Sequence, residues 1–225
     1  MPERFRVELA PSQAVTATEY PAVAQNRAGV TLILGPGVGA GQTSGFIVSF
    51  ADALSARGIT VVTFDFSYME HNRRVPDPND KLEACYRTVV EAVRERHRPI
   101  GEKLAIGGKS MGGRIASQVA ASGLRDLAGL VFLGYPLHPP GKPEQLRVKH
   151  LPGVKAAMLF VQGARDAFGT PAELRPLIER LKPLADLYIV EGGDHSFRVL
   201  KSAGIRQPDV YRAIQDKIES WLRAL

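Results

Sequence analysis

Apolar residues fall in short continuous runs that alternate with longer segments of helical period from about residue 30 to the end of the chain. Runs of this length are typical of strands buried on both faces of a parallel sheet, and helical segments between them cover such a sheet. The pattern predicts an α/β fold with a mostly parallel central sheet and helices on both faces. Six central strands are expected at residues 30–34, 60–66, 104–106, 128–133, 156–162 and 187–190.

The segments between these runs repeat their apolar residues every three or four positions, which is the spacing of one helix face. One helix has a clear start, because Thr170 can cap it, Pro171 suits its first turn and Glu173 can return the capping bond. Helices are expected at residues 43–57, 81–98, 112–122 and 171–181. A last helix is expected through the apolar stripe Val210, Ile214, Ile218, Trp221 and Leu222. Because Trp221 belongs to this stripe, we expect it in the core.

Two less regular segments lie outside this alternation. Residues 5–9 and 15–20 precede the first central strand and can add an antiparallel edge, with a turn at Pro11-Ser12 between them. Residues 135–154 contain five prolines and two glycines, which predicts a surface loop that is too short to form a helical lid. The chain is expected to form a single domain, residues 1–225.

Composition narrows the class of protein. With 44% hydrophobic and 23% charged residues, the chain can bury one sizeable core. No apolar run approaches the roughly 20 residues that cross a bilayer, and the first residues lack the apolar stretch of a secretory signal, so we expect a cytoplasmic protein with no membrane contact. Cys85 is the only cysteine and falls among apolar residues at helical spacing. We expect it to be buried, with no internal disulfide and no thiolate metal site.

The formal net charge of +6 raises the question of an acidic partner such as nucleic acid. The basic residues are spread along the chain, apart from small clusters at Arg73-Arg74 and residues 94–98, and no aromatic residues alternate with them. The glycine-rich segment 35–41 lacks the Gly-Lys-Ser/Thr ending of a phosphate-binding loop and a clean dinucleotide pattern. We therefore expect no nucleic-acid partner, no cofactor and no metal, and either a monomer or a homodimer.

The sequence Gly108-Lys109-Ser110-Met111-Gly112 lies between a predicted buried strand and a predicted helix. A G-x-S-x-G turn in that place holds a serine hydroxyl on strained backbone, and glycine on either side leaves room for the turn. Amides at the start of the following helix can stabilise an oxyanion on a substrate. A glycine-rich turn that serves packing alone is the alternative. The motif makes Ser110 a candidate nucleophile, which needs a base.

An acid and a histidine follow Ser110 at the ends of later predicted strands. Asp166 comes just after the fifth central strand and His195 just after the sixth, so all three residues are expected at the same edge of the sheet. His195 would accept the proton of Ser110, and Asp166 would fix the tautomer of the imidazole.

Other residues compete for these two roles. Asp194 would point away from its neighbour His195, and Asp186 lies at the opposite end of its strand. His138 is the main rival base because its loop also follows a strand, although its apolar neighbours indicate a pocket wall instead. The remaining histidines lie in a charged helical segment, where exposure is expected, or in polar connections: His97, His71 and His150.

A substrate cavity is expected around the same edge. The amides of Val38, in the glycine-rich loop after the first central strand, and of Met111 are the candidate oxyanion donors. Asp65 ends a predicted strand and Arg114 begins the helix after Ser110, so a buried ion pair between them would support the turn. The candidate wall residues are Lys109, Tyr135, His138, Lys142 and Phe168.

With these pieces together, the sequence resembles the α/β-hydrolase superfamily, and within it the small lidless dienelactone-hydrolase-like branch with its testis-expressed-type predicted hydrolases. The resemblance implies an α/β-hydrolase fold with Ser110, Asp166 and His195 as the triad. Relatives usually carry His-Gly where this chain has Pro36-Gly37, and dienelactone hydrolases have a cysteine in place of Ser110, so their lactone substrate is not carried over. The resemblance covers about residues 30–222 and rests on residues 107–113, 134–143, 162–166 with 168–169, and 193–197.

The residues therefore predict a serine hydrolase, most simply a carboxylesterase. It would act on a small-molecule carboxylic ester or thioester through an acyl-enzyme intermediate. A hydrolase-like binding or scaffold protein without turnover is the alternative, because a fold does not fix a function. Without a lid the cavity should be open, which suits a small or flexible acyl group better than a long lipid chain.

Overall fold

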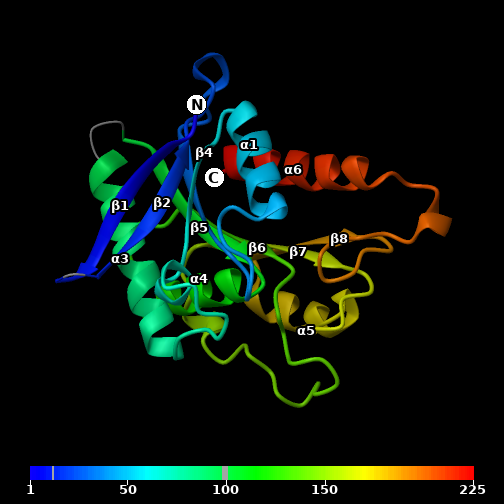
Figure 1. Ribbon diagram of the computed structural model, residues 1–225. Coiled ribbons are helices and arrows are strands. Elements are labelled where there is room, and N and C mark those ends of the chain that lie inside the picture. Colours follow the sequence, from blue (N-terminus) through cyan, green and yellow to red (C-terminus); the bar gives the residue numbers. More distant parts are fainter. Residues whose placement is uncertain (12, 98–100) are drawn as a thin grey trace.

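The computed structural model describes residues 1–11, 13–97 and 101–225, so Ser12 of the expected turn and Arg98 of the expected helix and basic cluster lie outside the described residues. The described chain forms one eight-stranded sheet in the order β1-β2-β4-β3-β5-β6-β7-β8, with helices packed on both sides of it (Figure 1). The strands are β1 (Glu3–Ala10), β2 (Gln13–Tyr20), β3 (Val30–Gly35), β4 (Thr60–Phe64), β5 (Lys103–Lys109), β6 (Gly129–Leu133), β7 (Ala157–Gly163) and β8 (Ala185–Val190).

The six strands from β3 to β8 are parallel, which confirms the predicted α/β fold. β5 is longer than expected and runs through Gly107 and Gly108 to Lys109. The two glycines stay in the sheet because their backbones pair with Val131 and Phe132 of β6. A Cβ on Gly107 would lie 1.9 Å from the Val131 carbonyl oxygen, so the close approach of the two strands requires glycine.

β1 and β2 form an antiparallel hairpin, and β2 pairs antiparallel with β4. This confirms the expected antiparallel edge. Val7, Val15 and Ala17 point from the hairpin into the core, whereas most of β1 is exposed, as is typical of an edge strand.

The longer helices form two sets, one on each face of the sheet (Figure 1). The first set, α1 and α6, buries residues such as Phe50 and Ile214, and the second set, α3, α4 and α5, buries residues such as Tyr86 and Ile115. The helices are α1 (Gly45–Ala56), α2 (Ser67–Glu70), α3 (Asn79–His97), α4 (Met111–Ala121), α5 (Pro171–Leu181) and α6 (Gln207–Arg223), with 3-10 turns η1 (Ala24–Asn26), η3 (Leu151–Gly153) and η4 (Lys201–Ala203). Among the described residues, none of these helices has the length and apolar character needed to span a bilayer.

Two local sequence signals for helices are confirmed. Thr170 and Glu173 form the complete capping box at the start of α5. Trp221 of α6 is only 8% exposed and its indole Nε1 donates to Asp186, so it is a core residue. The short helix α2 was not expected, because a single turn is too short to show a helical period.

The connection 134–156 between β6 and β7 contains no helical lid. Its only regular element is η3, and Figure 1 shows the rest as a long yellow-green loop beside α4 and α5. Leu137 and Leu151 of this loop are buried, and the amide of His138 donates to the Phe168 carbonyl at 3.0 Å, so the loop is tied to the body of the protein. The carboxyl ends of β3, β5, β7 and β8 are therefore left open at one edge of the sheet.

Candidate active site

Ser110 stands at the junction of β5 and α4 in a strained backbone conformation. Its φ of 51° and ψ of −114° are rare for a residue with a side chain. The turn is held because its amide donates to the Leu133 carbonyl at 3.0 Å. A Cβ on Gly108 or on Gly112 would lie 2.3 or 2.2 Å from the Gly35 carbonyl oxygen. Both flanking positions therefore accept only glycine, as the motif predicts.

The structure brings together the three residues that the sequence singled out. The imidazole Nε2 of His195 lies 2.9 Å from the Ser110 Oγ, and its Nδ1 lies 2.8 Å from the Asp166 Oδ2. Because the carboxylate accepts a hydrogen bond from Nδ1, Nε2 is left to accept from the serine hydroxyl. This is the arrangement of a nucleophile, a base and an orienting acid.

The Asp166 carboxylate is 1% exposed and is fixed by two further donors. The side-chain amide of Gln162 donates to Oδ2 at 2.8 Å, and the backbone amide of Phe168 donates to Oδ1 at 2.8 Å. These bonds direct the carboxylate toward His195. Sequence reasoning missed Gln162, although its place at the end of β7, four residues before the acid, could have indicated it.

The loop that carries His195 is fixed by its own hydrogen bonds. Asp194 accepts from the amides of Ser196 and Arg198 at 2.8 and 2.9 Å, so its carboxylate caps this turn and is not the partner of the imidazole. The Phe168 ring lies against the imidazole, with ring centroids 4.2 Å apart. The imidazole is thereby held between the acid and the aromatic ring.

Lys109 is a buried cation beside the nucleophile. Its Nζ donates to the main-chain carbonyl of His195 at 2.7 Å and lies 5.7 Å from the centre of the Phe197 ring. Burial lowers the pKa of this lysine to about 8, although the negative charges of Asp166 and Asp194 act to raise it. The ammonium therefore joins the turn of Ser110 directly to the loop of His195.

The two expected oxyanion donors both border the cavity that contains Ser110. Met111 is the first residue of α4, so its amide has no acceptor within the helix. Val38 is 57% exposed and belongs to the glycine-rich loop that backs Ser110, where a Cβ on Gly37 would lie 3.7 Å from the Ser110 Cβ. The positions suit oxyanion donors, and the donor role of the two amides stays a prediction.

This cavity has a volume of about 670 Å³. Of the expected wall residues, Lys109 and Phe168 line it. Other lining residues come from the segment before α3, from the start of α3, from α4 and from the 134–156 loop, and sequence reasoning did not place them on the cavity wall. They are Pro76, Asp77, Asn79, Leu82, Arg114, Pro136 and Arg147.

The remaining three expected wall residues do not line the cavity. Tyr135 is fully buried against Phe132 and Phe160. His138 is 5% exposed and bonds to Glu173 at 3.1 Å, which turns it toward α5. Lys142 is exposed on the outer turn of the loop. Within the loop, Tyr135 and His138 are buried and Lys142 faces solvent, so none of the three reaches the cavity wall.

The expected ion pair between Asp65 and Arg114 is absent. Asp65 instead accepts from the amide and side chain of Gln42, at 2.7 and 3.2 Å. Arg114 Nη1 donates to the side-chain oxygens of Asn79 at 2.9 Å and Gln118 at 3.0 Å. The arginine therefore contacts α3 and the body of α4 instead of Asp65.

The histidines outside the triad are engaged elsewhere. His97 is 7% exposed, which corrects the expected exposure, and it lies between Glu102 and Glu19. Hydrogen bonds to Glu102 and then to Glu19 raise its pKa to about 9. His71 bonds to the Ser67 carbonyl of its own helix at 2.7 Å.

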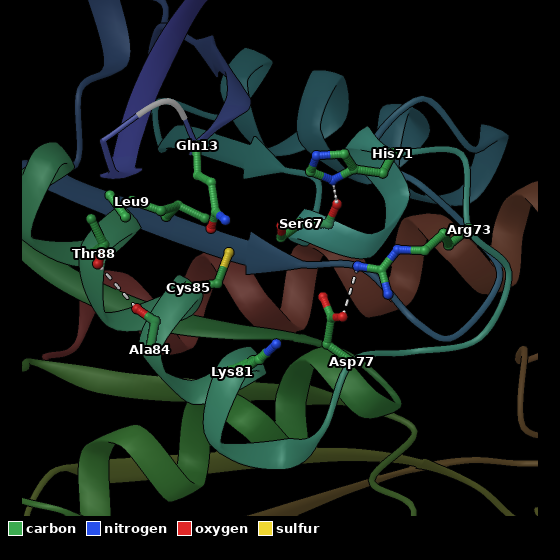
Figure 2. A pocket seen from close by; sticks show the side chains of 11 residues that line it. Leu9, Gln13, Ser67, His71, Arg73, Asp77, Lys81, Ala84, Cys85 and Thr88 are labelled. Atoms are coloured by element: carbon green, nitrogen blue, oxygen red, sulfur yellow. Dashed lines mark hydrogen bonds and ion pairs between the residues drawn. The ribbon is translucent and has the colours of Figure 1, made fainter.

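A second cavity of about 510 Å³ lies between the β1–β2 hairpin, α2 and α3, and Figure 2 shows the Cys85 sulfur pointing toward it. Burial raises the pKa of the Cys85 thiol to about 12, so the thiol stays protonated at neutral pH and is a poor nucleophile.

Within the part of the chain that the structure describes, no group of three or more His, Cys, Asp or Glu side chains could hold a metal ion.

Comparison with known proteins agrees with this geometry. The family model described as an alpha/beta hydrolase domain matches residues 28–223. The fold is similar to that of a lidless α/β serine hydrolase from Xanthomonas campestris, with a TM-score of 0.75 and 21% identity over 98% of this chain and 94% of that chain.

Two further solved structures are similar over nearly their whole length. A dienelactone hydrolase from Anabaena variabilis has a TM-score of 0.74 and 19% identity over 98% of this chain and 96% of that chain. An esterase from Pyrococcus furiosus has a TM-score of 0.75 and 15% identity over 100% of this chain and 92% of that chain. With its matching domain, its sheet order and the serine at its strand-to-helix turn, the chain belongs to the alpha/beta hydrolase family.

Proposed function

We propose that this protein is a serine hydrolase that cleaves carboxylic esters or thioesters through an acyl-enzyme intermediate. The observation that carries the proposal is the continuous hydrogen-bonded row from Ser110 to His195 to Asp166, with distances of 2.9 and 2.8 Å, at an open edge of the sheet. A hydroxyl, an imidazole and a buried carboxylate in this order form a nucleophile activated by a positioned base.

The chemistry follows from the positions of the atoms. Ser110 Oγ attacks the ester carbonyl while His195 Nε2 takes its proton, and Asp166 stabilises the imidazolium that forms. The amides of Met111 and Val38 would stabilise the oxyanion. Nε2 then returns the proton to the departing alcohol or thiol, which leaves an acyl group on Ser110. Water activated by the same imidazole hydrolyses this acyl group and restores the serine.

The open cavity supports a small or flexible acyl substrate. The 134–156 loop covers no tunnel, and the cavity of about 670 Å³ reaches the surface beside Val38. Long-chain lipid substrates favour an enclosed apolar site, which this edge of the sheet does not offer. Similar structures are described as a lidless serine hydrolase and an esterase, which also supports ester cleavage.

The direct test is hydrolysis of p-nitrophenyl acetate and butyrate, together with labelling by a fluorophosphonate probe. We expect turnover and labelling in the unmodified protein, and a loss of kcat of at least about 10⁴-fold with no labelling in Ser110→Ala. Ser220→Ala, an exposed serine of α6, is the matched control and should behave as the unmodified protein.

Two results would contradict the proposal. Turnover that survives Ser110→Ala would remove this serine from the mechanism. A folded protein that neither hydrolyses any member of an ester and thioester panel nor takes up the probe would favour the alternative of a binding or scaffold protein.

A further inference from the structure

Two arginines, Arg114 and Arg147, line the cavity that contains Ser110, and both also border a smaller neighbouring cavity of about 210 Å³. Neither guanidinium group has a carboxylate within ion-pair distance among residues 1–11, 13–97 and 101–225. Both side chains are half-buried. Two neighbouring cations without a counter-ion at the side of a candidate nucleophile are an unusual feature of the cavity, because half-buried charges are ordinarily paired.

The contacts of Arg114 hold its guanidinium without neutralising it. Its two side-chain partners are the amide oxygens of Asn79 and Gln118, which are neutral. Burial and then the charge of Arg147 lower the pKa of Arg114, although a guanidinium remains charged at neutral pH. Burial and Arg114 also lower the pKa of the nearby His150 to about 4, so that imidazole is neutral and adds no charge.

The nearest acidic side chains are already engaged. Asp77 borders the cavity but pairs with Arg73 at 2.7 Å, and Figure 2 shows the two side chains facing each other in the neighbouring cavity. Glu83 accepts from the side-chain amide of Asn79. Glu83 keeps its charge and opposes the lowering of the Arg114 pKa, but burial and Arg147 outweigh it, so positive potential persists at the two guanidinium groups.

The position of the pair relative to the nucleophile is fixed by the backbone. The amide of Arg114 donates to the Ser110 carbonyl at 3.1 Å, so the arginine lies one helical turn, about 6 Å along the axis, beyond the serine. Arg147 approaches from the loop, where its carbonyl accepts from the buried Tyr135 hydroxyl at 2.9 Å and its amide donates to Leu137 at 2.8 Å. The two arginines thus come from two rigidly held segments.

We propose that Arg114 and Arg147 form an anion subsite that binds a carboxylate of the substrate, several bonds away from the scissile carbonyl. A planar, singly charged carboxylate matches the fork of N–H donors that a guanidinium presents. The carboxylate can belong to the acyl part or to the alcohol part of the ester, and the chemistry recognised is the same. The assignment of an ester rests on the proposed function, whereas the binding of a carboxylate in this cavity can be measured without turnover.

Binding is tested in the Ser110→Ala background by calorimetry at pH 7.5. The probes are monoethyl glutarate, which carries one carboxylate, and ethyl pentanoate, which has the same acyl length and no charge. We expect the charged ester to bind about tenfold or more tightly than the neutral one. Arg147→Gln should remove this preference, and Arg147→Lys should keep part of it. Arg175→Gln, an exposed arginine of α5 outside the cavity, is the matched control for net charge and should keep all of it.

Turnover of the unmodified protein identifies the part of the ester that carries the charge. A pH-stat compares kcat/KM for monoethyl glutarate with ethyl pentanoate, and for 4-acetoxybutanoate with butyl acetate. One charged ester should be preferred over its neutral partner, and 0.5 M NaCl should weaken that preference because salt screens the guanidinium charges.

Equal binding of the charged and neutral probes to Ser110→Ala would overturn the subsite. A preference that is unchanged by Arg147→Gln would overturn it as well. Discrimination in binding without hydrolysis of any ester would support the subsite and refute the proposed function, so the two failures are distinguishable.

Discussion

Two neighbouring open cavities, one at Ser110 and one at Cys85, differ in what surrounds the atom that could act as a nucleophile. Segment 71–78 separates them, and its Asp77 borders both. The Ser110 cavity measures about 670 Å³ and the Cys85 cavity about 510 Å³. Sulfur is intrinsically the better nucleophile, yet of these two atoms it is the Ser110 Oγ that has an imidazole within hydrogen-bond distance.

The difference lies in the backbone that carries each residue. Ser110 ends a parallel strand at the edge where the loops after β7 and β8 also arrive, so a base and an acid meet it from distant parts of the chain. Cys85 lies within α3 and faces the hairpin edge of the sheet, where no strand delivers a base within contact of its sulfur among the described residues. In this fold, the ends of parallel strands bring reactive side chains together, and a cavity alone does not.

Of the substitutions that test this contrast between the cavities, replacement of the acid beside His195 should lower turnover the most. We expect Asp166→Asn to lower kcat for a p-nitrophenyl ester by about 10⁴-fold, because an amide nitrogen next to the imidazole favours the wrong tautomer. Asp186→Asn, at the opposite end of β8, is the matched control and should retain activity. If Asp166→Asn kept more than a tenth of kcat, the carboxylate would not be the orienting acid.

The meeting of Ser110, Asp166 and His195 could be predicted from the sequence because each of them follows a recognisable strand. Short buried runs, a glycine pair around Ser110 and the chain order of Asp166 and His195 are local signals, and parallel strands bring their carboxyl ends to the same edge. No knowledge of side-chain packing was needed to expect that they meet.

The cavity walls could not be predicted in the same way. Arg147 borders the cavity and Tyr135 does not, because the 134–156 loop folds back on itself and only its packing decides which side faces inward. His97 looked exposed because its own helix segment is charged, but Glu19 of β2, distant in the sequence, and Glu102, just beyond the helix, enclose it. Contacts of this kind depend on tertiary structure that no local pattern contains.

A smaller effect is expected from the cation that joins the two loops of the Ser110 cavity. Lys109 acts as a positioning residue through the His195 carbonyl, so Lys109→Met should lower kcat by about tenfold with little change in KM. Lys142→Met, on the exposed turn of the loop, is the matched control and should leave both constants unchanged. An equal loss in the two variants would show that Lys109 does not position His195.

Lys109 also makes stability depend on pH in a predictable direction. Burial lowers its pKa from 10.5 to about 8, so the unfolded chain binds more protons than the folded one between these values. The free energy of unfolding of the unmodified protein should therefore rise relative to Lys109→Met as the pH increases through this range, by up to about 3 kcal/mol. Urea titrations at pH 7.5 and 10 measure the difference, and parallel curves for the two proteins would contradict a buried ammonium.

The smallest effect is expected in the second cavity. Cys85→Ala should leave kcat and KM unchanged and reduce the free energy of unfolding by only about 1 kcal/mol, because the thiol acts there as a small buried apolar group. Iodoacetamide at pH 7.5 should label Cys85 slowly in the folded protein and rapidly in urea, with mass spectrometry as the readout. Rapid labelling of the folded protein would show that the Cys85 thiol is reactive although no strand end brings a base to it. A loss of ester turnover in Cys85→Ala would show that this cavity contributes to the reaction. Either result would contradict the contrast between the two cavities.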